Sequence, residues 1–148
     1  MDNQIQIGKT DSLEDFKALI QLFERVFEED NKEIPKDNHL QKLLDNSAFL
    51  PIVSKHLGKV IGGATVHILP QYYTTKPLAY LYDLAVEFEY QGYGIGKGIT
   101  TYASAYAKQL GCEEMYLQAE SIDTDAIAFY KATKMFSEMS VIQFTHKI

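Results

Sequence analysis

The sequence predicts a mixed α/β domain of the α+β kind, built around one central sheet. Two strand patterns at 49–56 and 60–69 flank Leu57-Gly58-Lys59, which indicates a β-hairpin. An apolar strand at 80–86 then runs through a glycine-rich link into a long helical pattern. Helix and strand patterns alternate through all 148 residues without a linker, repeat or low-complexity segment, so we expect a single domain over 1–148.

The N-terminal part predicts one strand and two helices. Ile5 and Ile7 alternate with polar residues, which is typical of a short strand. Asp11 or Ser12 can cap the helix that follows. Its apolar residues recur at spacings of three and four, which predicts one buried face made of Leu13, Phe16, Ile20, Phe23 and Phe27. Pro35 breaks the chain before a second short helix at 38–44.

The middle of the chain predicts tight packing around a buried strand. Gly62-Gly63 inside a strand pattern indicate a bulge or a close approach of two backbones. The strand at 80–86 is nearly all apolar, as expected for a central strand covered on both faces. The helix after the glycines has an expected buried stripe of Ile95, Ile99, Tyr102, Tyr106 and Leu110, and Gly111 ends it.

The C-terminal part predicts one more helix and three strands. A strand is expected at 115–119, followed by a helix at 123–133 that Asp123 or Thr124 caps. Apolar residues in the last part of the chain predict two short strands at 136–139 and 141–146.

Composition and charge exclude several classes of protein. Fourteen Lys and Arg residues against 20 Asp and Glu residues give a net charge of −6, which argues against nucleic acid and suits a cationic substrate. No apolar run approaches the roughly 20 residues of a membrane span, and the N-terminus has no signal-peptide pattern. The single cysteine, Cys112, is typical of a cytoplasmic protein, and the four histidines show no metal-binding spacing.

The glycine-rich link at 91–96 reads Q-x-x-G-x-G and predicts a phosphate site. Backbone N–H groups at a helix start have no intrahelical partner, and glycines let an anion approach them closely. The dinucleotide fingerprint G-x-G-x-x-G is excluded, because Lys97 stands where its third glycine would be. The P-loop is excluded as well, because Gly98 follows Lys97 in place of Ser or Thr.

These motifs together resemble the GNAT N-acetyltransferases, and most of all the fortimicin-type aminoglycoside 3-N-acetyltransferases. The resemblance is carried by Q-x-x-G-x-G after an apolar strand, by Tyr82-Asp83-Leu84-Ala85-Val86, by Gln118-Ala119-Glu120 and by Phe129-Tyr130. It implies the GNAT fold, with a mixed, mostly antiparallel sheet of about six to seven strands and about four helices. It also implies that the sheet splays open beside the central strand and that acetyl-CoA binds in the gap.

The resemblance implies that acetyl-CoA is bound by ten residues at the end of the central strand and in the glycine-rich link: Leu84, Ala85, Val86, Gln91, Gly92, Tyr93, Gly94, Ile95, Gly96 and Lys97. Asp83 is the candidate base, because it is the only charged residue in an apolar strand and lies in the matching motif. Glu120 is the alternative base. Tyr130, on the helix where the family keeps its acid, is the candidate acid. The expected substrate residues are Glu28, Glu29, Asp30, Tyr82, Asp83, Glu120 and Asp123.

We therefore expect acetyl-CoA-dependent acetylation of a primary amine on a cationic small molecule, specifically an aminoglycoside at its 3-N position. No serine or cysteine nucleophile motif is present, which favours direct attack by the amine in a ternary complex. A polyamine, another small amine or a protein amine remain alternative substrates. A GNAT-like sensor that binds acyl-CoA without catalysis is the alternative from another class of protein. The sequence predicts no metal, and it leaves a homodimer open.

Overall fold

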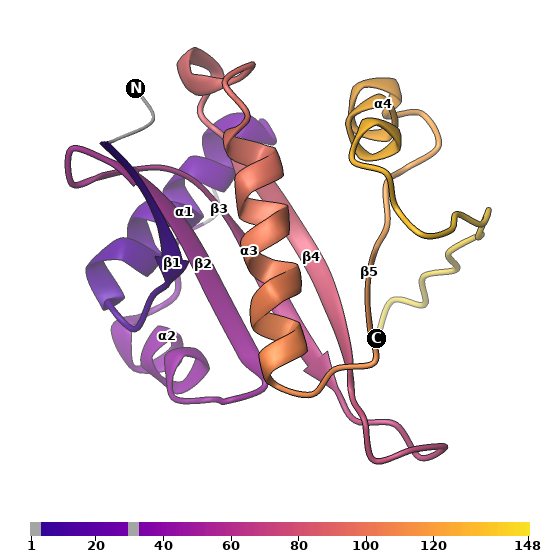
Figure 1. The fold of residues 1–148 in the computed structure, drawn as a ribbon. Coiled ribbons are helices and arrows are strands. Elements are labelled where there is room, and N and C mark those ends of the chain that lie inside the picture. The colour runs from indigo at the N-terminus through magenta and orange to yellow at the C-terminus, as the bar shows by residue number, and fades with distance from the viewer. Residues whose placement is uncertain (1–3, 30–32) are drawn as a thin grey trace. The chain divides into compact units, whose positions relative to one another are not determined.

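The computed structural model describes residues 4–29 and 33–148 of the chain, as five strands and four α-helices (Figure 1). It divides into two compact units, Met1–Gln118 and Ala119–Ile148, each of which is described by itself. The expectation of a single domain stays a prediction. None of the helices in these described residues is long and apolar enough to cross a membrane.

The first unit contains the whole sheet. Its strands are β1 (Ile5–Lys9), β2 (Phe49–His56), β3 (Lys59–Leu69), β4 (Leu78–Val86) and β5 (Glu114–Leu117). They lie side by side in chain order. Each neighbouring pair is antiparallel except β4 and β5, which run parallel. The expectation of a mixed, mostly antiparallel sheet is confirmed.

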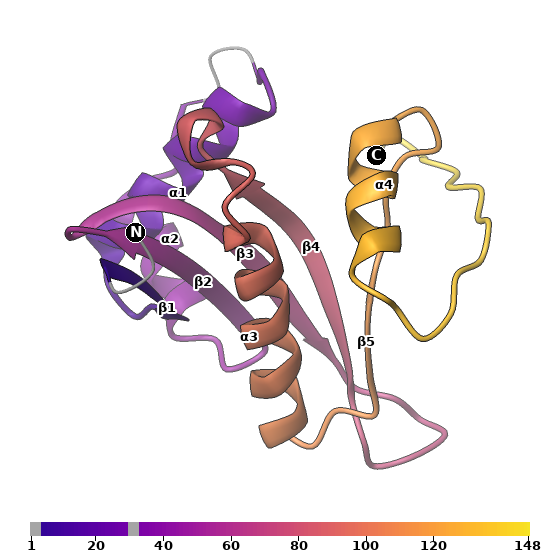
Figure 2. The ribbon, with the colours of Figure 1, turned by 45° about the horizontal axis from the view of Figure 1, so that its top comes forward.

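Helices cover both faces of this sheet (Figure 2). On one face lie α1 (Leu13–Val26) and α2 (Asp37–Leu44), and on the other lies α3 (Ile95–Gln109), which leads from β4 into β5. Leu19 and Leu22 of α1 pack with Val53 of β2 and Ala85 of β4. The larger cluster, on the α3 face, joins that helix to β2, β3 and β4. Apolar burial on both faces therefore holds β4 between α1 on one side of the sheet and α3 on the other.

The buried faces of two helices differ from the prediction. The buried residues are Phe16, Leu19 and Leu22 in α1, and Ile95, Ile99, Thr100, Ala103 and Ala107 in α3. Tyr102 and Tyr106 are only half-buried, and Leu110 is exposed. The hydroxyl of Tyr102 accepts the N–H of Lys9 at 3.0 Å. Small alanines let the helix approach the sheet, whereas a tyrosine keeps its hydroxyl at the edge of the core.

Gly63 marks the close backbone approach that the sequence predicted. A Cβ atom at this position would overlap the carbonyl oxygen of Ile52 and lie 2.5 Å from Cδ1 of Leu19. The neighbouring register shift opposite Ser54 and Lys55 also confirms the predicted bulge.

We expect Gly63→Ala to destabilise the protein by about 1–3 kcal/mol, because the added methyl group overpacks the core between β3 and α1. The melting temperature measures this effect. Gly8→Ala is the matched control, since a Cβ on that strand glycine would have its nearest neighbour 4.0 Å away, at the Tyr102 hydroxyl. Equal melting temperatures for the two variants would contradict the tight packing at Gly63.

The second unit contains one helix, α4 (Thr124–Ala132), and no strand. Oδ1 of Asp123 accepts the N–H of Ala126 at 3.0 Å, so Asp123 is the predicted N-cap. The predicted strands at 136–139 and 141–146 are wrong for this chain, and the sheet accordingly has five strands. An alternating pattern gives a segment the propensity to form a strand, but the strand forms only where a neighbouring strand supplies hydrogen bonds.

Candidate active site

The sheet opens along the second half of β4. Leu78 to Leu81 pair with β5, whereas in the described residues Asp83 to Val86 pair with β3 alone and Tyr82 pairs with neither strand. The backbone N–H and C=O groups on the outer edge of this half are therefore without a strand partner. The splayed sheet expected from the resemblance is confirmed.

A bulge in β4 sets the direction of the side chains at this opening. Thr65 of β3 pairs with Asp83 and the next residue, Val66, pairs with Leu81, so Tyr82 is the additional residue. Leu81 packs in the α3-side core, whereas Ala85 packs in the α1-side core. Because side chains alternate along a strand, Asp83 shares the α1 side with Ala85. The bulge thus turns the carboxylate toward the α1 face.

The environment of Asp83 favours its protonated form. The side chain is half-buried, and this burial is the largest of the effects that raise its pKa above the ordinary value of 3.8. The negative charge of Glu29 raises the pKa further, while His67 lowers it. A carboxylate with an increased proton affinity is better suited to accept a proton than an ordinary exposed aspartate.

Aromatic rings beside Asp83 form a row across three strands. The His67 ring lies 5.8 Å from that of Tyr82, Tyr82 lies 5.7 Å from Tyr80, and Tyr80 stacks on Tyr116 of β5 at 4.6 Å. Tyr82 is 59% exposed. Burial, more than the neighbouring charges, raises the pKa of Tyr80. The sequence analysis did not assign His67 or Tyr80 to the site, and only the pairing of His67 with Tyr80 across β3 and β4 brings them together.

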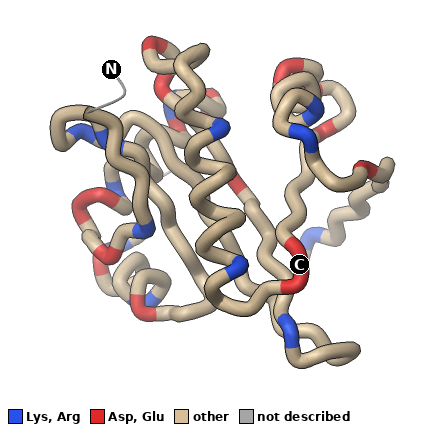
Figure 3. The backbone as a smooth tube through the Cα atoms, in the orientation of Figure 1, with Lys and Arg blue, Asp and Glu red and all other residues tan. Residues whose placement is uncertain are grey.

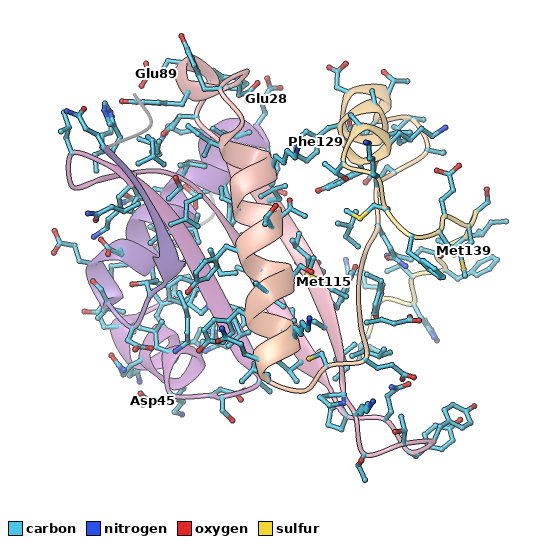
Figure 4. The ribbon with its side chains drawn as sticks, viewed as in Figure 1. Glu28, Asp45, Glu89, Met115, Phe129 and Met139 are labelled. Carbon is cyan, nitrogen blue, oxygen red and sulfur yellow. The ribbon has the colours of Figure 1, made fainter. Side chains whose placement is uncertain are left out.

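The acidic segment after α1 reaches the neighbourhood of Asp83. Glu28 and Glu29 are exposed, Glu28 has a φ of 53°, and its position at the end of α1 is labelled in Figure 4. Arg25 of α1 forms an ion pair with Glu87, the residue after β4. This pair connects the end of α1 with the end of β4. Glu29 is accordingly close enough to raise the pKa of Asp83, while the predicted substrate residue Asp30 lies outside the described residues.

The loop from Gln91 to Gly94 and the start of α3 have the features of an anion-binding site. Gly92 and Gly94 have φ values of 85° and 80°, a conformation that favours glycine. Nε2 of Gln91 donates to the carbonyl of Val86 at 2.9 Å, which holds the loop against the end of β4. The first turn of α3 has a lysine and no acidic residue (Figure 3). Its N–H groups and helix dipole fit a pyrophosphate.

Several of the predicted cofactor residues have side chains that point into the core. Ala85, Val86 and Ile95 are buried, and Leu84 is half-buried. These residues can therefore offer only backbone groups to a cofactor. Tyr93 and Lys97 are exposed, so their side chains remain accessible.

The remaining predicted site residues belong to the second unit. Tyr130 is half-buried on α4, and its ring contacts that of Phe129 at 5.1 Å in an edge-on arrangement. Glu120 is exposed before the helix, and the carboxylate of Asp123 already accepts the capping hydrogen bond. In the described parts of both units, no three His, Cys, Asp or Glu side chains gather as a metal site would require.

The open sheet and the anion site at the start of α3 are features of an acyltransferase that uses a coenzyme A thioester. The sequence model of the acetyltransferase (GNAT) family matches residues 16–134. The chain therefore belongs to the GNAT family and is a GNAT N-acetyltransferase.

Among solved structures, the chain is similar to the aminoglycoside acetyltransferase meta-AAC0020 from an uncultured soil metagenomic sample. Its complex with trehalose is 42% identical, with a TM-score of 0.97 over 99% of this chain and 98% of that chain. Its complex with sisomicin is 41% identical, with the same TM-score and coverage. No curated protein matches the chain significantly.

A more distant structure shares the fold alone. The ribosomal-protein-alanine N-acetyltransferase of Brucella melitensis biovar Abortus 2308 is 19% identical, with a TM-score of 0.74 over 95% of this chain and 99% of that chain. The family fold therefore accommodates different acceptors, and the acceptor has to be argued from the site.

Proposed function

We propose that this protein acetylates a primary amine of an aminoglycoside, at the 3-N position, with acetyl-CoA as the donor. The similarity to meta-AAC0020 carries this proposal, because it extends over 99% of the chain at 42% identity. That enzyme was solved with sisomicin, an aminoglycoside. The acidic groups around Asp83 support the same kind of substrate, because they attract a polycation.

The first unit contains two features that would hold acetyl-CoA. The N–H groups at the start of α3 would bind the pyrophosphate, with Lys97 beside them. The unpaired backbone edge from Tyr82 to Val86 would bind the amide-bearing arm as a neighbouring strand would. Acetyl-CoA supplies the activated acetyl group and a thiolate leaving group. We place this reaction in the cytoplasm, where acetyl-CoA is available and Cys112 stays reduced.

Asp83 would take up the proton of the acceptor, and Tyr130 would stabilise the leaving group. The ammonium group of the acceptor must lose a proton before its nitrogen can form the amide bond, and Asp83 would accept this proton directly or through a water. As the carbon–sulfur bond breaks, the Tyr130 hydroxyl would donate a hydrogen bond to the departing sulfur, because a phenol holds its proton more tightly than a thiol does. The coenzyme A thiolate would then leave, and release of the proton from Asp83 would restore the enzyme. Glu120 is the alternative base.

The substrate surface would combine negative charge with aromatic rings. Glu28, Glu29 and Asp83 would attract the ammonium groups, with Asp123 and Glu120 as further acidic groups from the second unit. Tyr82, the most exposed ring of the row at β4, would pack against an apolar face of a sugar ring. This combination suits a rigid polycation better than a simple alkyl amine.

A thiol-release assay with a panel of amines tests the proposed function. We expect rapid thiol release with acetyl-CoA and sisomicin, and mass spectrometry and NMR should locate the acetyl group on the 3-amine. Faster turnover of a polyamine or of a peptide amine would identify that amine, instead of an aminoglycoside, as the substrate. Binding of acetyl-CoA with no turnover of any amine would identify a sensor instead of an enzyme.

The affinity for a cationic substrate should fall as salt is added. Exposed charges such as Glu28 and Glu29 are screened over about 8–10 Å at moderate ionic strength, so their attraction for a polycation weakens. Calorimetric titration of sisomicin at several salt concentrations measures this effect. Glu89→Gln serves as the control and should keep the salt dependence of the wild type. It removes an exposed carboxylate from η2 (Phe88–Tyr90), outside the expected substrate residues. Binding that does not depend on salt would contradict electrostatic steering by these carboxylates.

A further inference from the structure

Tyr90 anchors the segment that leads from β4 into α3. All other residues of 88–94, which form η2 and the glycine-rich loop, are exposed. The Tyr90 ring, by contrast, is half-buried and packs against the core on the α3 side of the sheet. Glu89, the residue before it, is labelled in Figure 4 beside the N-terminal end of α3. The position of the loop therefore depends on what holds Tyr90.

His56 of β2 holds the hydroxyl group of Tyr90. Nδ1 of His56 lies 3.0 Å from this hydroxyl, and Nε2 lies 3.1 Å from Oε1 of Gln4. Because an amide oxygen only accepts hydrogen bonds, Nε2 carries the hydrogen, and Nδ1 of the neutral ring accepts the hydroxyl hydrogen of Tyr90. The two rings also meet edge to face, with their centroids 5.5 Å apart. The imidazole thus connects the start of the sheet with η2.

The backbone of His56 is fixed without the help of this contact. As the last residue of β2, it pairs with Ile5 of β1 on one side and with Lys59 of β3 on the other. A side chain on a paired strand positions its partner more precisely than a side chain on a loop does. His56 is therefore the fixed member of the contact, and η2 with the glycine-rich loop is the part that it restrains.

The glycine-rich loop has little packing of its own to keep its shape. A Cβ atom added at Gly92 or at Gly94 would meet no described atom within 4 Å, so neither glycine is packed against another element. Glycine also has the greatest backbone freedom of all residues. Ordering this loop only when an anion binds would cost conformational entropy and lower the affinity, and a loop that is already ordered avoids this cost.

We propose that His56 is a positioning residue of the donor site, which holds the glycine-rich loop through the Tyr90 hydroxyl in the shape that receives the pyrophosphate of acetyl-CoA. This inference rests on acetyl-CoA as the proposed donor. His56 acts through Tyr90 and takes no part in the transfer of the acetyl group. Loss of the hydrogen bond between them therefore lowers the affinity for the donor and leaves the chemical step unchanged.

Tyr90→Phe tests this role, because it removes only the hydroxyl group. By calorimetry, we expect the Kd of acetyl-CoA to rise about 3- to 10-fold, which is the effect of one hydrogen bond. At saturating acetyl-CoA, kcat should equal that of the wild type. An unchanged Kd in the folded variant would overturn the proposal. If the wild type itself binds no acetyl-CoA, the proposed donor is wrong, and the role of His56 falls with it.

Tyr102→Phe is the matched control. Tyr102 is also half-buried against the same core, and its hydroxyl accepts the N–H of Lys9 at 3.0 Å, but it lies about two turns into α3 and away from the loop. Its loss of a hydrogen bond should lower the melting temperature as Tyr90→Phe does, with no change in the Kd of acetyl-CoA. An equal rise of the Kd in both variants would show a general loss of stability and overturn the role of His56.

His56→Phe and the double variant show whether the two residues act as one unit. Phenylalanine keeps a ring for the edge-to-face contact but has no nitrogen for the Tyr90 hydroxyl. His56→Phe should raise the Kd as Tyr90→Phe does, and the double variant should raise it no further, because both changes remove the same bond. Effects on the Kd that multiply in the double variant would mean that the two residues act separately, which would overturn the proposal.

Hydrogen exchange in the absence of acetyl-CoA measures the order of the loop directly. Mass spectrometry should show faster exchange of the backbone amides of 88–94 in Tyr90→Phe and in His56→Phe than in the wild type, because the restraint on the loop is lost. Tyr102→Phe should exchange in this segment as the wild type does. Equal exchange of 88–94 in all four proteins would mean that His56 does not order the loop, and the proposal would be wrong.

Discussion

Replacing Tyr130 by phenylalanine is expected to lower kcat about 10²-fold, which is the effect of removing one acid–base group. The variant loses only the hydroxyl, so the edge-on contact with Phe129 at 5.1 Å can remain. Cofactor affinity should change little, because the expected contacts with acetyl-CoA lie at α3 and β4. Steady-state kinetics and calorimetry with acetyl-CoA separate these two effects.

Tyr106→Phe is the matched control for this experiment. Tyr106 is also a half-buried tyrosine on a helix, but it packs at the edge of the core on α3. Its loss of a hydroxyl should leave kcat close to that of the wild type. If Tyr130→Phe turns over as fast as this control, Tyr130 only packs, and the departing thiolate is stabilised without it.

Local sequence patterns predict the α-helices and strands of the first unit, because their caps, turn glycines and apolar periodicity are visible over short stretches of sequence. Ser12 caps α1, and its Oγ accepts the N–H of Asp15 at 3.2 Å. Gly111, with a φ of 83°, follows the end of α3. The C-terminal strands could not be predicted correctly in the same way, because a strand depends on a partner that no local pattern specifies.

The candidate site is predictable only where a residue stands out in its local sequence. Asp83 stands out as the one charge in an apolar strand, and Gly92 and Gly94 stand out by their spacing. The proximity of Glu29 and His67 to Asp83 is not visible in the sequence. It depends on the pairing of β3 with β4, on the bulge at Tyr82 and on where α1 ends. These are long-range features, which only the assembled sheet determines.

The raised pKa of Asp83 predicts how stability depends on pH. Burial raises the folded-state pKa above the ordinary 3.8, so the fold prefers the protonated carboxyl group. This contribution to stability is complete below the ordinary pKa and is lost as the pH rises through the folded-state pKa. Asp83→Asn removes the charge, so it should melt at the same temperature as the wild type or higher at neutral pH. A clearly lower melting temperature would indicate that the ionised carboxylate is needed by the scaffold.

Asp83→Asn is also expected to lower kcat/KM at neutral pH by about 10²-fold or more, because general-base catalysis is lost. Asparagine keeps the size of the side chain but cannot accept the proton of the ammonium group. The loss should become smaller as the pH rises toward the amine pKa of about 10, where solvent removes this proton instead. In the wild type, the acidic limb of the profile should lie above pH 3.8, in the direction in which burial and Glu29 shift Asp83.

The pH profiles of kcat/KM for the two proteins decide the role of Asp83. Profiles that converge at high pH, at similar melting temperatures, are expected if Asp83 accepts the proton. Glu120→Gln is the control, since Glu120 is the alternative carboxylate and is exposed in the second unit. It should retain the shape of the wild-type pH profile, while the loss of one charge that attracts the substrate lowers kcat/KM at every pH. Parallel profiles for wild type and Asp83→Asn, together with a rescue of Glu120→Gln at high pH, would identify Glu120 as the base. Only the loss of the group that accepts the proton is compensated at high pH, where solvent removes the proton instead.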